Sequence, residues 1–207
     1  MIQLNNVSKK YAGKRVIDQV SCQVAKGVLH ISGHNGSGKT TLLNIMSGSL
    51  APDEGRILYS GYDIYDKQSY RIKNAIGYIP DSAPVYPFLS GNDFLKFICK
   101  VKKAEWPFEL IECLNLEKHL STNFLSMSYG TKKKFLFISG MVGNPHYLLL
   151  DEPLNGLDQH AVSELYNLIT KHLHCDNKVC VIVSHDLSWI DKWRECFNYF
   201  SLELNCK

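Results

Sequence analysis

Residues 33–40 read Gly-His-Asn-Gly-Ser-Gly-Lys-Thr, a pattern of glycines, a lysine and a hydroxyl that can bind a polyphosphate. The glycines let the backbone wrap closely, so that successive N–H groups can point at the β- and γ-phosphates. Lys39 adds a point charge, and the Thr40 hydroxyl is placed for Mg²⁺. The pattern predicts a nucleoside triphosphate site whose binding residues are Gly33, Asn35, Gly36, Ser37, Gly38, Lys39, Thr40 and Thr41.

A pair of adjacent carboxylates follows the apolar run at residues 147–150. Asp151 can hold Mg²⁺ through its water shell, and Glu152 can polarise an attacking water. Two adjacent carboxylates at the end of a strand repel each other unless a cation or a water network lies beside them. We therefore predict a metal-binding role for Asp151 and a catalytic role for Glu152.

Two further polar residues extend this candidate site. Asp158 belongs to the turn "NGLD" at residues 155–158, and His185 follows the apolar run at 179–184. At the exit of a parallel strand, His185 could reach a γ-phosphate bound over the carboxyl edge of the sheet. A lone histidine is more often structural, but this position favours a second catalytic residue.

The elements that must position these residues can be recognised from their hydrophobic patterns. A short strand at 28–32 enters the glycine-rich turn, and a helix at 40–48 follows it. The runs at 147–151 and 179–184 are continuously apolar, which is typical of central parallel strands. An amphipathic helix at 161–173 lies between them. Strand, helix, strand in this order predicts a parallel α/β sheet.

The middle of the chain has a different pattern. The segments "NDFLKFICKV" and "FELIECLNL" predict two short helices with no strand between them. We expect a helical arm at about 86–135, inserted into an α/β core formed by about 1–85 and 136–207. The whole chain would then be a single domain with an inserted subdomain.

Composition excludes several classes of protein. The chain has 207 residues, a net charge of +3 and 45% hydrophobic residues, so there is no electrostatic case for nucleic acid. Its apolar runs are far shorter than the roughly 18–20 residues that span a bilayer, and its start lacks the apolar region of a signal peptide. Seven cysteines without CxxC spacing indicate neither a disulfide framework nor a zinc site. We expect a cytoplasmic chain.

The motifs in this order resemble the ATP-binding domain of ABC (ATP-binding cassette) proteins over nearly the whole chain. "GHNGSGKTTLL" resembles the family's Walker A, "LLLDEP" its Walker B with the catalytic glutamate, "NGLD" its D-loop and "SHD" its switch histidine. The resemblance implies a RecA-like P-loop NTPase core with an N-terminal antiparallel β subdomain, and ATP and Mg²⁺ as cofactors. It also implies that adenine stacks on Tyr11 and that Val16 lines the same pocket.

The segment "MSYGT" at 127–131 aligns with the family's LSGGQ signature, because of its distance before Asp151. The resemblance implies that Ser128, Tyr129 and Gly130 contact ATP held by the opposite subunit. The alternative serine, Ser126, lies two residues too early.

The residues after Ser128 are consistent with a helix that begins there. Ser128 is a good N-cap for "TKKKFLFISGMV". Lys132, Lys133 and Lys134 fall in the first turn, where cations oppose the helix macrodipole. We interpret these lysines as favouring an anion at this end of the helix, with a solvated basic face as the alternative.

The chain departs from the family pattern at several positions. Tyr129 and Thr131 stand where the family has Gly and Gln, and Asp81 stands at the Q-loop glutamine, where it could offer an oxygen to Mg²⁺. The stretch "YIPD…YPFLS" resembles ABC-2 exporters. Its residues Pro84, Tyr86, Pro87 and Phe88 could receive a membrane subunit or pack on the chain's own arm.

The resemblance therefore implies an ATP-hydrolysing transporter subunit that dimerises, with itself or with a related chain, around two ATP molecules. It would drive a transmembrane permease subunit, with export as the expected direction, and lie on the cytoplasmic face of the inner or plasma membrane. The alternative is a soluble ABC ATPase that assembles iron–sulfur clusters or another cytosolic complex.

Overall fold

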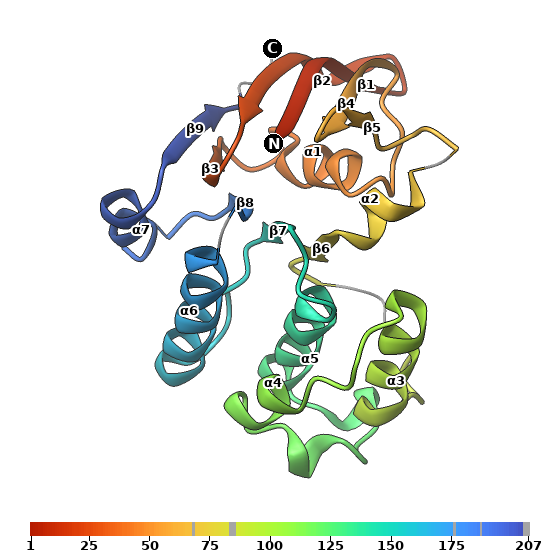
Figure 1. Ribbon diagram of the computed structural model, residues 1–207, viewed down its shortest axis with the longest axis vertical. Coiled ribbons are helices and arrows are strands. Elements are labelled where there is room, and N and C mark those ends of the chain that lie inside the picture. The colour runs from red at the N-terminus through yellow and green to blue at the C-terminus, as the bar shows by residue number, and fades with distance from the viewer. Residues whose placement is uncertain (68, 83–85, 176, 187, 205–207) are drawn as a thin grey trace.

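A computed structural model describes residues 1–67, 69–82, 86–175, 177–186 and 188–204 of the chain. Figure 1 shows an antiparallel sheet at one end of the molecule, a parallel sheet across its middle and a group of helices at the other end. This arrangement confirms the predicted α/β fold with an N-terminal β subdomain and a helical arm.

The antiparallel sheet has the strand order β2-β1-β4-β5. Its strands are β1 (Ile2–Tyr11), β2 (Lys14–Val24), β4 (Glu54–Tyr59) and β5 (Tyr62–Asp63). Ile2 and Leu4 of β1 are buried while Gln3 between them is only half-buried, which is the alternation of a sheet with one covered face. This sheet packs its apolar face on the rest of the molecule.

The parallel sheet has the strand order β6-β7-β8-β3-β9, and every neighbouring pair is parallel. Its strands are β3 (Gly27–Ser32), β6 (Ile76–Ile79), β7 (Tyr147–Asp151), β8 (Val179–Val183) and β9 (Tyr199–Glu203). All residues of β7 and β8 are buried, as the continuous apolar runs predicted. Because the strands are parallel, the segments that follow β3, β7 and β8 meet at one edge.

Side chains of β7 alternate between two hydrophobic cores. Tyr147 and Leu149 face the core shared with α1 and the antiparallel sheet, while Leu148 and Leu150 face the core shared with the other helices. A fully buried leucine contributes about 1.5–3 kcal/mol relative to an exposed one. The strand that carries the two carboxylates is therefore anchored firmly on both faces.

Helices precede or follow each of the parallel strands along the chain. Helix α6 (Gln159–His174) joins β7 to β8 and α7 (Ile190–Cys196) joins β8 to β9, while α1 (Lys39–Met46) follows β3 and α2 (Tyr70–Asn74) precedes β6. In α6 the buried residues Ala161, Leu165, Ile169 and Leu173 recur every four positions, which gives the single apolar face of an amphipathic helix. The helices predicted at 40–48 and 161–173 are thus present.

The arm contains α3 (Gly91–Lys102), α4 (Phe108–Cys113), and two short 3-10 helices at Glu117–His119 and Phe124–Ser126. The following helix, α5 (Tyr129–Met141), runs through the predicted arm boundary at residue 135, and that boundary stays a prediction. Within the described ranges, no helix is both long and apolar enough to cross a membrane.

Candidate nucleotide-binding site

The glycine-rich loop joins β3 to α1 and has the conformation that an anion site requires. Gly38 has φ of 94°, and a Cβ there would lie 2.8 Å from the Ile17 side chain and 3.0 Å from that of Val16. Only glycine fits this left-handed and crowded position without strain. The loop can therefore turn directly into α1 and place backbone N–H groups at its mouth.

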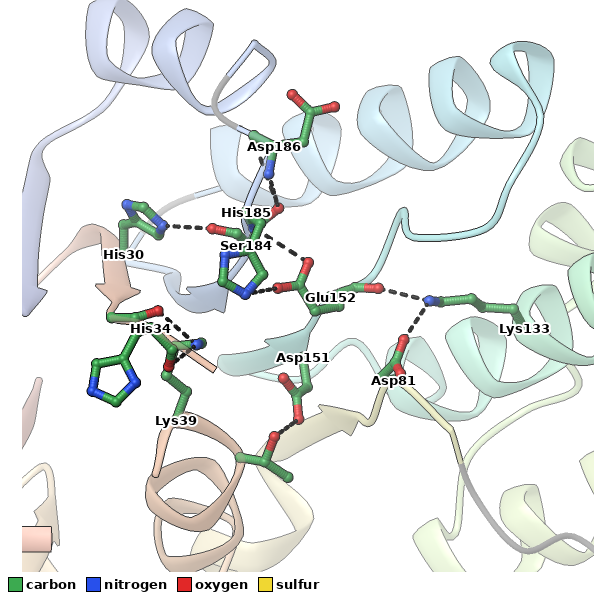
Figure 2. A network of polar contacts seen from close by, with 12 residues as sticks. His30, His34, Lys39, Asp81, Lys133, Asp151, Glu152, Ser184, His185 and Asp186 are labelled. Carbon is green, nitrogen blue, oxygen red and sulfur yellow. Dashed lines mark hydrogen bonds and ion pairs between the residues drawn. The ribbon is translucent and has the colours of Figure 1, made fainter. Parts of the chain in front are cut away.

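Polar groups of the loop are available to a phosphate. The Lys39 ammonium donates to the carbonyls of Gly33 at 2.7 Å and His34 at 3.0 Å, which are neutral partners (Figure 2). The Ser37 hydroxyl is buried and has no hydrogen-bond partner in the described part of the chain. A buried hydroxyl without a partner is costly, and an anionic ligand beside it would supply one. The donor set of the loop fits a nucleotide phosphate.

Thr40 and Asp151 meet at the end of β7. The Thr40 hydroxyl donates to Asp151 Oδ2 at 2.7 Å. Burial raises the pKa of the Asp151 carboxyl above its ordinary value, and the bond from Thr40 opposes that rise. Mg²⁺ prefers oxygen ligands, and the Thr40 hydroxyl and the Asp151 carboxylate each supply one. The structure brings together Thr40 and Asp151, two of the three predicted metal-binding residues.

Glu152 follows Asp151 in a left-handed conformation with φ of 45°. Its N–H donates to the Val183 carbonyl at 2.9 Å, which ties it to β8. Burial is the main cause that raises the pKa of its carboxyl. Oε1 is buried and accepts no hydrogen bond in the described residues, so it keeps its capacity to accept one.

His185 lies beside this carboxylate, as predicted. Its backbone N–H donates to Glu152 Oε2 at 3.4 Å, and its Nε2 lies 3.6 Å from Oε1, within ion-pair range but longer than a hydrogen bond. The imidazole is 56% exposed and stands over the open edge of the sheet (Figure 2). It can turn toward a ligand without unpacking the core.

His30, which was not among the predicted site residues, contacts the backbone of Ser184, the residue before His185. His30 Nε2 lies 3.1 Å from the Ser184 carbonyl, and His30 Nδ1 lies 2.9 Å from the Tyr199 hydroxyl. Arg194 donates to that hydroxyl at 3.1 Å, so the hydroxyl donates to Nδ1 and Nε2–H donates to Ser184. Burial lowers the pKa of His30, which favours this neutral form. Its position inside an apolar strand gave no signal of this role.

A cavity of about 1290 Å³ opens over the carboxyl edge of the parallel sheet. The predicted residues that line it are Val16, Asn35, Gly36, Gly38, Lys39, Thr40, Thr41, Asp151, Glu152 and His185. The predicted residues outside its lining are Tyr11, Gly33, Ser37, Asp81, Ser128, Tyr129, Gly130 and Asp158. The cavity extends along α6 to Trp189 and Lys192, which the sequence did not single out.

Tyr11 and Asp158 occupy different environments from the cavity residues. Tyr11 is 47% exposed at the end of β1, with the Lys9 ammonium 6.0 Å from its ring centroid. Asp158 is the N-cap of α6 and accepts from the Ala161 N–H at 2.8 Å. The adenine-stacking role of Tyr11 and the D-loop role of Asp158 stay predictions.

Ser128 is the N-cap of α5 and lies outside the lining of the chain's own cavity. Its hydroxyl accepts from the Thr131 N–H at 3.2 Å, which is the predicted N-cap. Ser128 is exposed and Gly130 is half-buried. Tyr129 is 47% exposed, and one edge of its ring lies over Gly156, where an added Cβ would lie 2.7 Å from it.

The lysines after Ser128 were interpreted as favouring an anion at this end of the helix. That interpretation is wrong for Lys133 and Lys134. Lys133 is buried and pairs with Asp81 at 2.9 Å, and Lys134 pairs with Glu164 at 3.0 Å. Both ammonium groups are satisfied within the chain and do not need an external anion. The pairing also gives Asp81 a partner that was not predicted, and its metal-binding role stays a prediction.

The aromatic residues before α3 are exposed. Tyr86 and Phe88 are 68% and 70% exposed, with ring centroids 5.5 Å apart. They do not pack into the chain's own arm, which was one of the two predicted alternatives. Pro84 lies outside the described residues.

Comparison with known proteins identifies the family. The model of the ABC transporter family matches residues 17–155, which includes the phosphate loop, the Thr40–Asp151 pair and Glu152. The chain therefore belongs to the ABC transporter family, and its site is that of the ATP-binding member.

Curated relatives agree with this assignment. A protein of Staphylococcus haemolyticus, provisionally named as the hemin import ATP-binding protein HrtA, is 30% identical over 89% of this chain and 90% of its own length. The bacitracin transport ATP-binding protein BcrA of Enterococcus faecalis is 28% identical over 93% of this chain and 63% of its own. The chain thus spans less than two thirds of the BcrA sequence.

Solved structures confirm the fold. An ATP-binding subunit of an ABC transporter superimposes with a TM-score of 0.86 at 21% identity, over 99% of this chain and 88% of that one. The dimeric cassette MJ0796 bound to ADP and Pi gives a TM-score of 0.81 at 24% identity, over 99% and 97%. The fold is that of an ABC ATPase cassette.

Proposed function

We propose that this chain is the ATP-hydrolysing subunit of an ABC transporter, working with Mg²⁺. The observation that carries the proposal is the convergence of Lys39, the Thr40–Asp151 pair and Glu152 at one edge of the parallel sheet. Phosphoryl transfer needs little beyond positioned charge and a positioned water, and these groups supply both.

Each residue has a separate role in the proposed reaction. Lys39 and the loop N–H groups hold the phosphates, and Thr40 with Asp151 holds Mg²⁺, which neutralises charge on the transferred group. Glu152 accepts the proton of the attacking water, for which its raised pKa and an Oε1 that accepts no hydrogen bond in the described residues are suited. His185 donates toward the γ-phosphate from the edge of the cavity.

A second subunit is part of the proposal, because Ser128 and Gly130 lie outside the cavity of their own chain. Ser128 is exposed and Gly130 half-buried at the start of a helix, where they can contact a nucleotide held by a partner. The relative MJ0796 is dimeric with ADP and Pi, which supports this arrangement. The partner cassette can be a second copy or a related chain.

We further propose a transmembrane permease as the driven partner, and a position on the cytoplasmic face of the membrane that contains it. The exposed Tyr86 and Phe88 supply an aromatic surface of the kind found in protein interfaces. Export is the direction we propose, from the "YIPD…YPFLS" resemblance and the bacitracin-transport name of one relative. The hemin-import name of the other makes direction an experimental question.

Affinity purification from detergent-solubilised membranes tests the proposal. We expect a polytopic membrane protein to co-purify and to raise ATP hydrolysis above that of the chain alone. Replacing Tyr86 and Phe88 with serine should abolish co-purification and leave ATP binding unchanged. Recovery of a soluble scaffold instead would favour the assembly-ATPase alternative, which neither relative named above supports. Transport by inside-out vesicles then decides direction.

A further inference from the structure

Lys133 places a buried ammonium group among four polar atoms, and Figure 2 shows its contacts to Glu152 and Asp81. Its side chain is 1% exposed, and its Nζ lies 2.7 Å from the Glu152 carbonyl, 2.9 Å from the Asn155 carbonyl and 2.9 Å from Asp81 Oδ1. The Tyr129 hydroxyl is more distant, at 3.4 Å. An ammonium has three protons, so the three short contacts use all of them.

The contact to the Glu152 carbonyl bears on catalysis. Glu152 has φ of 45°, a conformation that residues other than glycine rarely adopt, and the surroundings must hold it there. The Val183 carbonyl holds its N–H, while Lys133 and the Asn155 N–H, at 3.2 Å, hold its carbonyl. Because the backbone sets the direction of the Cα–Cβ bond, these bonds also aim the carboxylate.

Asp81 supplies the charge that makes this arrangement possible. A buried ammonium is tolerated only when it is paired and hydrogen-bonded, and Asp81 is its ion-pair partner. The negative charge of Asp81 also raises the pKa of both Asp151 and Glu152, while Lys133 lowers that of Asp151. The pair is therefore close enough to the carboxylates to affect them.

We infer that Lys133 is a positioning residue for ATP hydrolysis, which fixes the Glu152 backbone through its carbonyl, and that Asp81 is its counter-ion. The inference rests on the proposed ATPase function. The inference also gives Asp81, which stands where the family has the Q-loop glutamine, a role: its carboxylate is the ion-pair partner of a lysine on α5. Lys133 Nζ therefore joins three segments: its own helix α5, Asp81 after the end of β6, and the turn after β7.

The test measures kcat and the Kd for ATP separately, because a positioning residue should affect kcat and leave the Kd nearly unchanged. Lys133→Met keeps an unbranched side chain one atom shorter than lysine and removes all donors, so kcat should fall by about 10- to 100-fold, as a displaced catalytic group does. The Kd for ATP, which depends on the loop rather than on Glu152, should change by less than about 3-fold. Lys134→Met, one position along the same helix and bonded to Glu164, is the matched control and should keep kcat.

A double variant separates positioning from simple charge balance. Asp81→Asn leaves the ammonium without a counter-ion and should lower Tm, while Asp81→Asn with Lys133→Met should recover Tm because no charge remains. Its kcat should stay low, because the Glu152 carbonyl still lacks the Lys133 ammonium and keeps only the longer bond from the Asn155 N–H. Recovery of kcat in the double variant, or unchanged kcat in Lys133→Met, would overturn the inference.

A readout without turnover distinguishes this inference from the proposed function. Crystal structures of the wild type and of Lys133→Met should differ at Glu152, whose φ is expected to leave the left-handed region when its carbonyl loses the ammonium. An unchanged Glu152 in the variant would contradict the positioning role even if the wild type hydrolysed no ATP. Absence of ATP hydrolysis in the wild type would instead contradict the proposed function.

Discussion

The phosphate loop and the first turns of α5 each carry a lysine close to the carboxylates, yet the two ammonium groups are bound differently. Lys39 donates to two neutral carbonyls, and within the described chain no carboxylate lies at ion-pair distance from it. Lys133 has a carboxylate partner and is fully enclosed. A cation held only by carbonyls can exchange them for an anion, whereas one held by a carboxylate in a buried site cannot do so cheaply.

The same contrast divides α5 itself. Ser128 is exposed, while Lys133, five residues further on, is buried and paired with Asp81. The start of this helix therefore combines an exposed residue, for which we propose a contact with a partner subunit, and a buried one that contacts the chain's own Glu152 carbonyl. Variants of the two residues should give different phenotypes.

The largest effect should come from Glu152→Gln, which removes the base but keeps the size of the side chain. We expect kcat to fall by about 10²- to 10⁴-fold, the usual contribution of a general base, with ATP binding retained. Because the nucleotide then persists, an ATP-dependent dimer should accumulate and be visible by size-exclusion chromatography. A variant that hydrolyses ATP at the wild-type rate would refute the role of Glu152.

Lys39→Ala tests the exchangeable lysine. Loss of a charge-assisted hydrogen bond to phosphate should weaken ATP binding by about 10- to 100-fold, measured by calorimetry. The matched change Lys134→Ala, remote from the loop, should leave affinity as it is. Equal affinities for wild type and Lys39→Ala would remove the basis for the comparison between the two lysines.

Ser128 can be examined by two substitutions that separate its cap from its outward hydroxyl. Ser128→Ala should cost about 1 kcal/mol of unfolding free energy through loss of the N-cap, and Ser128→Gly only a few tenths. Both lack the hydroxyl, so both should weaken the ATP-dependent dimer in a Glu152→Gln background. A Ser128→Gly variant that dimerises normally would show that the hydroxyl is not used between subunits.

The smallest expected effect is on the pH dependence of the free energy of unfolding. Burial raises the pKa of Glu152 in the folded protein above its ordinary value of 4.5. The folded state therefore keeps its proton to higher pH than the unfolded state does, and stability falls as pH rises above 4.5. Glu152→Gln removes this contribution, so its nucleotide-free Tm at neutral pH should exceed that of wild type by less than about 3 °C. A lower Tm for the variant would contradict the sign.

Much of the fold could be predicted because the pattern of each element lies within one short segment of the sequence. The apolar runs of β7 and β8 and the four-residue repeat of α6 each lie within one segment, and so does the phosphate loop. The meeting of Thr40, Asp151 and Glu152 follows once the strands are parallel, since their carboxyl ends share one edge.

The partner of Lys133 could not be predicted in this way. Asp81 is 52 residues away, and a triple lysine at a helix start is usually solvated. One signal was present, because a third carboxylate near Asp151 and Glu152 requires a compensating cation. His30 carried no such signal, since its two partners lie on a loop and a strand more than 150 residues further along the chain.

The left-handed backbone at residue 152 has a consequence for mutational tolerance. Replacement by glycine or asparagine removes the base while relieving strain, so such variants should be inactive but well expressed. Valine, isoleucine or threonine would be inactive and also poorly folded, because a β-branched residue resists that φ. A saturation library at this single codon, scored for abundance and for activity, would therefore split into two classes of loss that activity alone cannot tell apart.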